Sequence, residues 1–115
     1  MAIWLLEDND ERIKTFVDLF PDIIIHKTSK SFIKDLKANN KPGDILYLDH
    51  DLGKTTPEDP NCGMDVVRFL EEKHLPLGHI FVHSFNSYAS RVMVARLRSC
   101  RYSSFLQSLD NLGKK

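Results

Sequence analysis

The sequence lacks a net charge, a long apolar run and any cluster of cysteines. Its 16 basic and 16 acidic side chains cancel, so no overall field attracts DNA, RNA or an anionic membrane. No apolar stretch approaches the roughly 20 residues that a membrane-spanning helix requires. Walker, GxGxxG and HExxH motifs are all absent. We therefore expect neither a nucleic-acid-binding surface nor a membrane-spanning segment.

Cysteine usage and the first residues bear on the compartment. Cys62 and Cys100 are far apart and show no CxxC pattern. Residues 1–6 carry no basic leader and run directly into acidic residues, which is not the pattern of a signal peptide. Two isolated cysteines without a leader are expected to be reduced thiols. The sequence therefore predicts a cytoplasmic protein, in the host cytoplasm if its source is a phage.

What is present is an alternation of short apolar runs with helical patterns. The apolar runs have no polar alternation, which is typical of strands covered on both faces; they are residues 3–6, 23–25, 45–48 and 80–82. Between them, apolar residues recur at helical spacing. These helical positions are Ile13, Phe16, Val17, Phe20, Phe32, Ile33, Leu36, Val66, Val67, Leu70, Val92, Met93 and Leu97. Asn9 or Asp10 is expected to cap the first helix, and Thr28 or Ser29 the second.

Strands that alternate with helices indicate βαβ units, a parallel sheet and right-handed crossovers. A chain of 115 residues fits one hydrophobic core, so we predict one domain over residues 1–115. The predicted fold class is α/β, a doubly wound and mainly parallel sheet of flavodoxin-like order 2-1-3-4. The pattern weakens after about residue 100. Residues 102–106 form either a short fifth strand or a helical turn, and Leu109 and Leu112 are expected in a short last helix.

Polar side chains follow three of the predicted strands at the point where each strand ends. In doubly wound sheets, ligands bind beyond the carboxyl ends of the strands. With strand order 2-1-3-4, the first, third and fourth strands are neighbours, so their terminal groups are expected to meet on one rim. These groups are Glu7, Asp8, Asp49, His50, Asp51, His83, Ser84 and Asn86.

Carboxylates gathered on one rim repel one another, and a divalent cation resolves the conflict. Oxygen ligands suit Mg²⁺ or Mn²⁺, and added histidines suit Mn²⁺, Fe²⁺ or Zn²⁺. Such an ion attracts phosphate oxygens or acidifies a bound water. Along an extended strand, Asp49 and Asp51 face one side and His50 the other. The chain must therefore bend after Asp49 if all three are to share the site.

Each of these residues also has a structural interpretation. Glu7 and Asp8 suit the first turn of a helix, where they complement its dipole. Asp49 suits a turn, Ser84 and Asn86 suit a cap and a turn, and a lone His83 is more often a hydrogen-bonded core residue. Their joint placement at one end of one sheet favours a functional site.

Other polar residues form no comparable cluster. Arg91, Arg96, Arg98 and Arg101 are either a solvated basic face near a helix C-terminus or an anion clamp in which Arg91 is nearest the rim. Cys62 is interpreted as a bystander. Three histidines without matching partners are interpreted as structural or solvated, namely His26, His74 and His79. Trp4 and Tyr47 are interpreted as core aromatics.

The strand ends resemble those of a receiver domain, a module that accepts a phosphoryl group. By that resemblance Asp49 is the phosphoacceptor position, Glu7 and Asp8 hold Mg²⁺, and Ser84 is the hydroxyl that follows the phosphate. Receivers also carry a lysine at the end of the fifth strand, which pairs with the phosphoryl group. Here residues 74–113 contain no lysine. This departure disfavours a phosphoacceptor.

Three motifs are similar to a divergent branch of that fold, the cyclic-phosphate processing receiver-like family. They are DHDLG at residues 49–53, GMDVV at 63–67 and HSFN at 83–86. The resemblance covers about residues 3–98. It implies action on a cyclic phosphate, such as a cyclic nucleotide signal, in microbial or phage conflict.

The leading hypothesis is a metal-dependent phosphodiesterase that uses Mg²⁺ or Mn²⁺ and takes a small phosphorylated or cyclic nucleotide ligand. The expected metal ligands are Glu7, Asp8, Asp49 and Asp51. The expected catalytic residues are His50, His83 and Asp49, with an imidazole as general acid, general base or further ligand. The expected substrate-binding residues are Ser84, Asn86 and Arg91. The alternatives are a receiver-like signalling module and a module that sequesters a nucleotide without turnover. The oligomeric state does not follow from the sequence.

Overall fold

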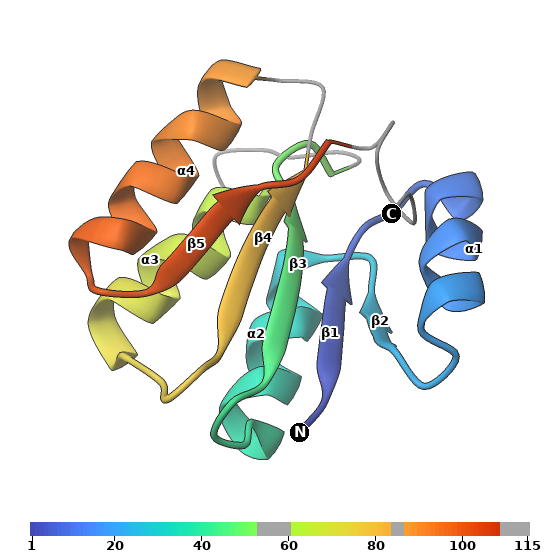
Figure 1. Ribbon diagram of the computed structural model, residues 1–115, viewed down its shortest axis with the longest axis horizontal. Helices are drawn as coiled ribbons and strands as arrows, with labels where there is room; N and C mark the ends of the chain where they lie inside the picture. Colours follow the sequence, from blue (N-terminus) through green and yellow to red (C-terminus); the bar gives the residue numbers. More distant parts are fainter. Residues whose placement is uncertain (53–60, 84–86, 109–115) are drawn as a thin grey trace.

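The computed structural model describes residues 1–52, 61–83 and 87–108. These residues form a parallel five-stranded sheet and four helices (Figure 1). The strand order is β2-β1-β3-β4-β5, which confirms the predicted order and adds a fifth strand at one edge. The strands are β1 (Ile3–Leu6), β2 (Ile24–His26), β3 (Ile45–Asp49), β4 (His79–His83) and β5 (Ser103–Leu106). The helices are α1 (Asp10–Leu19), α2 (Ser29–Asn39), α3 (Gly63–Lys73) and α4 (Ser87–Ser99).

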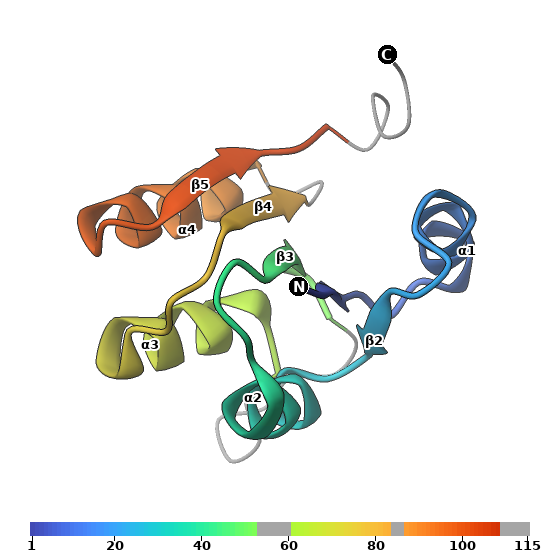
Figure 2. The ribbon, with the colours of Figure 1, turned by 60° about the horizontal axis from the view of Figure 1, so that its bottom comes forward.

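The sheet is covered by helices on both faces, although unequally. Helices α2, α3 and α4 lie on one face and α1 lies on the other (Figure 2). Side chains of a strand alternate between the two faces, so Trp4 and Leu6 join the larger core cluster while Leu5 joins a smaller one with Phe16 and Tyr47. Trp4 and Tyr47 are therefore core aromatics, as predicted. None of the helices in the described residues has the length and apolar character needed to span a bilayer.

Side-chain caps fix where the first two helices begin. The Asn9 side chain accepts a hydrogen bond of 3.0 Å from the Arg12 N–H, and the Thr28 side chain accepts one of 3.2 Å from the Ser31 N–H. Each bond satisfies one of the donors that a helix N-terminus leaves unpaired, so the predicted caps are confirmed. The α1 cap matters for function because it starts the helix immediately after the acidic end of β1.

The second strand lies one residue further along the chain than predicted. Residues 23–25 were expected, but the Ile23 N–H is used by the preceding turn, where it donates to the Phe20 carbonyl at 3.0 Å. His26 extends the strand at its other end, because it pairs with Leu6 and its carbonyl accepts from the Glu7 N–H at 3.0 Å. The strand is half-buried rather than buried, since it lies at the edge of the sheet.

The fifth strand resolves the alternative left open for residues 102–106. Ser103–Leu106 pairs in parallel with β4, so this segment is a strand and not a helical turn. Helix α4 packs against it, which explains why a short and weakly apolar segment is held at the edge. The last helix predicted around Leu109 and Leu112 lies outside the described residues.

Candidate functional site

Three buried polar side chains meet at the carboxyl ends of the central strands. Glu7 follows β1, Asp49 is the last residue of β3, and His83 is the last residue of β4. Asp49 and His83 are partners in the parallel register of β3 and β4. One potential ligand atom from each residue lies within 4.8 Å of the others. Their exposed fractions are only 0, 2 and 1%, so this predicted convergence produces a cluster with almost no solvent contact.

Glu7 is held in its ionised form by a ring of donors. Its Oε2 accepts from the backbone N–H groups of Asp8 at 3.0 Å and Asn9 at 3.2 Å. Arg12 donates from Nε to Oε1 at 2.7 Å and from Nη2 to Oε2 at 3.2 Å. Burial raises the pKa of Glu7, but hydrogen bonds from His83 and Arg12 outweigh it and lower the pKa to about 2. Glu7 is therefore an anion at every physiological pH.

Asp49 has the opposite tendency, although it lies in the same cluster. Burial and the negative charge of Glu7 raise the pKa of Asp49 to about 8. Its Oδ1 accepts a bond of 3.3 Å from the Asp51 N–H, whereas its buried Oδ2 has no hydrogen-bond partner in the described part of the chain. Arg12 Nη2 lies 3.7 Å from that Oδ2 and only partly offsets the charge of Glu7. Two carboxyls with pKa values driven apart are typical of functional sites.

His83 has one paired and one unpaired ring nitrogen. Its Nε2 lies 3.1 Å from Glu7 Oε1, and because an ionised carboxylate only accepts, Nε2 carries the hydrogen. Its Nδ1 is buried and makes no hydrogen bond to any described residue. The ring packs beside Phe16, with the centroids 5.1 Å apart. The interpretation of His83 as a hydrogen-bonded core residue therefore explains Nε2 but not Nδ1.

His50 and Asp51 form a second, outer pair. The chain bends at His50, but within the described residues the bend does not bring Asp49, His50 and Asp51 into one cluster. His50 Nδ1 lies 2.8 Å from Asp51 Oδ1, and Asp51 is 57% exposed. Neither these two residues nor Asp8 belongs to the tight cluster found within the described residues. The DHDLG motif thus contributes Asp49 to the buried cluster and places its next two side chains nearer to solvent.

Gly63 allows α3 to begin directly against the carboxyl end of β3. A Cβ atom at this position would lie 2.2 Å from the Asp49 carbonyl oxygen and 2.7 Å from Met93 Cε. The Gly63 N–H also donates to the His50 carbonyl at 3.1 Å. Asp65, two residues on, accepts from the Cys62 N–H at 3.0 Å and from Ser29 Oγ at 2.8 Å. The GMDVV motif is therefore a structural support of the Asp49 loop.

The remaining predicted residues are placed as follows. Ser84 and Asn86 lie outside the described residues. Arg91 is exposed on α4 and lines a cavity with Arg98. Arg96 does not join them, because it forms an ion pair with Glu71 on α3. The four arginines are thus not one cluster, and the anion clamp reduces to Arg91 and Arg98.

Arg12 is the site residue that the sequence reasoning missed. In receivers, the corresponding cation is the lysine at the end of the fifth strand. In this chain the positive charge comes instead from the first turn of α1, only five residues beyond Glu7. The sequence does contain a signal for this contact. A helix capped at Asn9 places residue 12 in its first turn, from which a long side chain reaches back to the strand end before the cap.

His26 was interpreted as a structural or solvated residue without matching partners. The structural interpretation is confirmed, whereas the absence of partners is wrong. Its Nε2 lies 2.8 Å from Asp35 Oδ2 and its Nδ1 lies 3.0 Å from Ser31 Oγ. Its ring also stacks on Trp4 at 6.5 Å. The extension of β2 by one residue brings His26 against α2, which the sequence pattern had not predicted.

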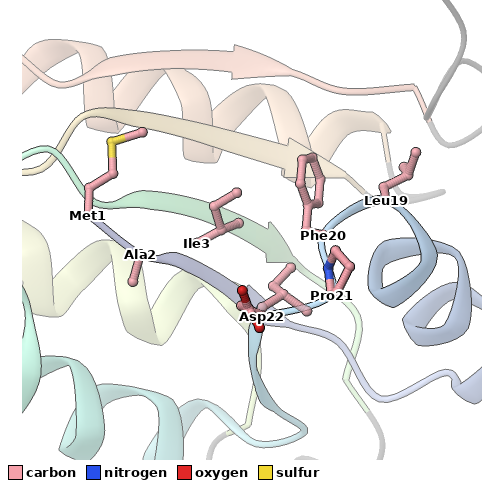
Figure 3. A pocket seen from close by; sticks show the side chains of 8 residues that line it. Met1, Ala2, Ile3, Leu19, Phe20, Pro21 and Asp22 are labelled. Carbon is pink, nitrogen blue, oxygen red and sulfur yellow. The ribbon is translucent and has the colours of Figure 1, made fainter.

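A cavity of about 340 Å³ lies elsewhere in the fold (Figure 3). It is lined by the first residues of the chain and by the turn after α1, which include Ile3 and Phe20. These segments lie at the amino end of β1, whereas Glu7 follows its carboxyl end. This mainly apolar cavity is therefore separate from the acidic cluster.

The fold and the cluster together define the class of protein. An acidic residue after β1, an aspartate at the end of β3 and order 2-1-3-4-5 are the framework of a receiver-like α/β domain. A response regulator from Colwellia psychrerythraea is similar in structure, with TM-score 0.63 and 19% identity over 92% of this chain and 83% of that one. The signal receiver domain of a protein described as a Luxo repressor, from Vibrio parahaemolyticus, has TM-score 0.66 and 18% identity over 96% and 82%.

The family is more specific than the fold. Residues 2–99 match the cyclic-phosphate processing receiver domain, so the chain belongs to that family, as the three motifs had indicated. A comparison with curated proteins gives no significant match.

Proposed function

We propose that this protein is a metal-dependent phosphodiesterase that hydrolyses a cyclic phosphate, with a cyclic nucleotide signal as its substrate. The observation that carries the proposal is the buried pair Glu7 and Asp49 beside His83, in which Asp49 Oδ2 has no hydrogen-bond partner among the described residues. A role in microbial or phage conflict follows from kinship with the family and belongs to the same proposal.

The donor set fits a divalent cation. Two carboxylates and an imidazole within 4.8 Å of one another suit Mn²⁺, and the carboxylates alone suit Mg²⁺. A cation would also remove the repulsion that raises the pKa of Asp49. When bound, such an ion supplies a Lewis acid for a phosphoryl oxygen and lowers the pKa of a bound water. Asp8 and Asp51 stay candidates for outer ligands.

Arg12 is suited to hold both the acid pair and the substrate anion. Its guanidinium is bonded to Glu7 at 2.7 Å and lies 3.7 Å from Asp49 Oδ2. A guanidinium fixed in this way binds phosphate oxygens in a defined orientation. Arg12 thus takes over the electrostatic task that a lysine performs in receivers.

His83 is the better general acid or base of the two candidate histidines. Glu7 holds its Nε2, which fixes the tautomer, and Nδ1 is left to exchange a proton when the carboxylates alone hold the ion. In the hydrolysis, a water oxygen forms the new bond to phosphorus while the ester P–O bond breaks. The proton lost by the water and the proton gained by the leaving oxygen balance, and His83 is placed to transfer one of them. His50 would assist from the rim, and Ser84 and Asn86 keep the substrate-binding roles that the sequence predicts for them.

The test is cleavage of a panel of cyclic mono-, di- and trinucleotides with Mg²⁺ or Mn²⁺, followed by chromatography. The Asp49→Asn variant should lose activity by at least about a hundredfold, because an amide cannot replace the anionic ligand. Asp18→Asn, which changes an exposed carboxylate on α1, is the matched control and should keep full activity. Metal-independent cleavage, or equal cleavage by Asp49→Asn, would contradict the proposal.

A receiver-like phosphoacceptor is the second candidate, favoured by the position of Asp49 at the end of β3 and by the similarity to receiver structures. It predicts an acyl phosphate on Asp49 after incubation with a small phosphodonor, detected as a mass increase that Asp49→Asn abolishes. Tight nucleotide binding with no product and no acyl phosphate would instead indicate sequestration.

A further inference from the structure

A groove lies between α4 and β5, at the β5 edge of the sheet. Its volume is about 410 Å³, which is in the range of small-ligand sites. Four of its residues occupy one face of α4 at positions i, i+3, i+4 and i+7. The lining residues are Arg91, Val94, Ala95, Arg98, Phe105 and Leu106.

The groove combines two cations with an exposed aromatic floor. Phe105 is 42% and Leu106 53% exposed, although both are large apolar residues on an edge strand, where exposure is a liability. Arg98 is fixed over this floor, because its Nε donates to the Ser104 carbonyl at 2.8 Å and its guanidinium lies 5.7 Å from the Phe105 ring centroid. No carboxylate in the described residues forms an ion pair with Arg91 or Arg98. Both charges therefore remain to be used by a ligand.

The strand register relates the groove to the acidic cluster. Leu106 pairs with Val82, the residue before His83, and the chain continues along β4 through a bond of 2.9 Å from the Gln107 N–H to the Val82 carbonyl. β5 lies two strands away from β3, which carries Asp49. Phe105 pairs with Phe81, two residues before His83. At roughly 5 Å per strand and about 3.3 Å per residue, the backbones of Phe105 and Asp49 are about 12 Å apart. A single phosphate group does not reach both positions.

We infer that the α4–β5 groove binds a base and a second phosphate of the substrate, so that the protein selects cyclic oligonucleotides over cyclic mononucleotides. The inference rests on the proposed function, since it assumes that the first phosphate lies at the acidic cluster. Phe105 and the Arg98 guanidinium offer flat surfaces on which a base stacks. Arg91 and Arg98 neutralise the second phosphate. An acidic peptide satisfies the two charges but has no reason to adjoin a phosphate site.

The experiment measures binding and turnover separately. Binding of cyclic di-AMP, cyclic di-GMP, cyclic tri-adenylate and cyclic AMP is measured by calorimetry with Mn²⁺ in a His83→Gln background, in which turnover is expected to be slow. Cleavage is measured with Mn²⁺ in the wild-type background. The variants are Arg91→Ala, Phe105→Ala and Phe105→Trp, with Lys37→Ala on α2 as the control for loss of a surface charge. Thermal melts establish that each variant is folded. If Phe105→Ala does not fold, Phe105→Trp keeps the test of this position valid.

The expected result is a Kd for the cyclic oligonucleotides that rises about tenfold in Arg91→Ala and in Phe105→Ala. Phe105→Trp should retain the affinity, Lys37→Ala should have no effect, and cyclic AMP should bind weakly to all. The inference is overturned if the groove variants change neither Kd nor KM, if cyclic AMP is bound and cleaved equally well, or if a polyglutamate peptide binds the groove and no oligonucleotide does.

The two proposals fail in different ways. Metal-dependent cleavage that is indifferent to Arg91 and Phe105 leaves the proposed function intact and overturns the groove. Oligonucleotide binding with Mn²⁺ that depends on Arg91 and Phe105, without cleavage by the wild type under any metal, supports the groove and contradicts the phosphodiesterase.

Discussion

Replacing Asp49 by asparagine should stabilise the metal-free protein, and the gain should grow with pH. In the folded protein the pKa of Asp49 is raised to about 8 by burial and by Glu7, whereas an unfolded aspartate has a pKa near ~3.9. Between these values the folded state holds a proton that the unfolded state has lost. The free energy of unfolding therefore falls as the pH rises from about 4 to about 8 and then levels off. Asparagine mimics the protonated acid and has no such loss.

The size of the effect follows from one proton. Each pH unit inside this window changes the free energy of unfolding by at most about 1.4 kcal/mol. From pH 6 to pH 7.5 the wild type should lose up to about 2 kcal/mol relative to Asp49→Asn, or about 8 °C in Tm for a domain of this size. Glu7 does not contribute, since its pKa of about 2 lies below the window.

The assay is a pair of thermal melts in EDTA at half-unit steps from pH 5 to pH 8.5. Every other ionisable side chain is the same in the two proteins, so the difference in Tm reports on position 49. Asp18→Asn is the control and should follow the wild type at every pH. Parallel curves for wild type and Asp49→Asn would refute the reasoning, because they would mean that Asp49 is already ionised in the folded protein and that no cation is needed there.

Four further outcomes are expected. Saturating Mn²⁺ should stabilise the wild type more as the pH rises, with the apparent affinity increasing up to tenfold per unit below about pH 8 as Asp49 gives up its proton; calorimetry that finds a pH-independent affinity contradicts this. Arg12→Ala should cost about 1–3 kcal/mol in urea denaturation, because it removes two hydrogen bonds from a buried anion, and Arg12→Lys should recover only part of it. Gly63→Ala should cost about 1–3 kcal/mol through the clash with the Asp49 carbonyl and should also lower kcat. His83→Gln should reduce kcat by about 10²–10⁴, whereas His50→Gln should reduce it by less than about tenfold; the reverse order would reassign the catalytic histidine.

The fold followed from the sequence because each of its signals is local. An apolar run such as residues 45–48 is too short and too uniform for anything but a covered strand, and Asn9 and Thr28 mark helix starts in their own right. The signals that set where a strand begins or ends are less local. Whether Ile23 begins β2 depends on a turn that uses its N–H, and whether residues 102–106 form a strand depends on packing against α4. Neither contact is encoded in the segment itself.

The candidate site was predictable to the extent that topology dictates it. Once β1, β3 and β4 are neighbours, Glu7, Asp49 and His83 must meet at their ends. Side-chain partnership is a finer matter. Arg12 joins the cluster through the reach of a long side chain from a capped helix, and Asp51 leaves it through the bend at His50. These outcomes depend on rotamers and on one turn, which residue spacing does not fix.

Glu7 and Arg12 lie within six residues of one another, on a strand end, a cap and one helical turn. The ion pair at the heart of the site is thus a short, self-contained unit that needs nothing from the far edge of the sheet. In a protein whose cation came from the fifth strand, every change in that strand would risk the chemistry. Here β5 contributes no residue to the acidic cluster. On the two proposals made above, ligand selectivity at β5 can therefore change, by evolution or by design, without any change in the cluster.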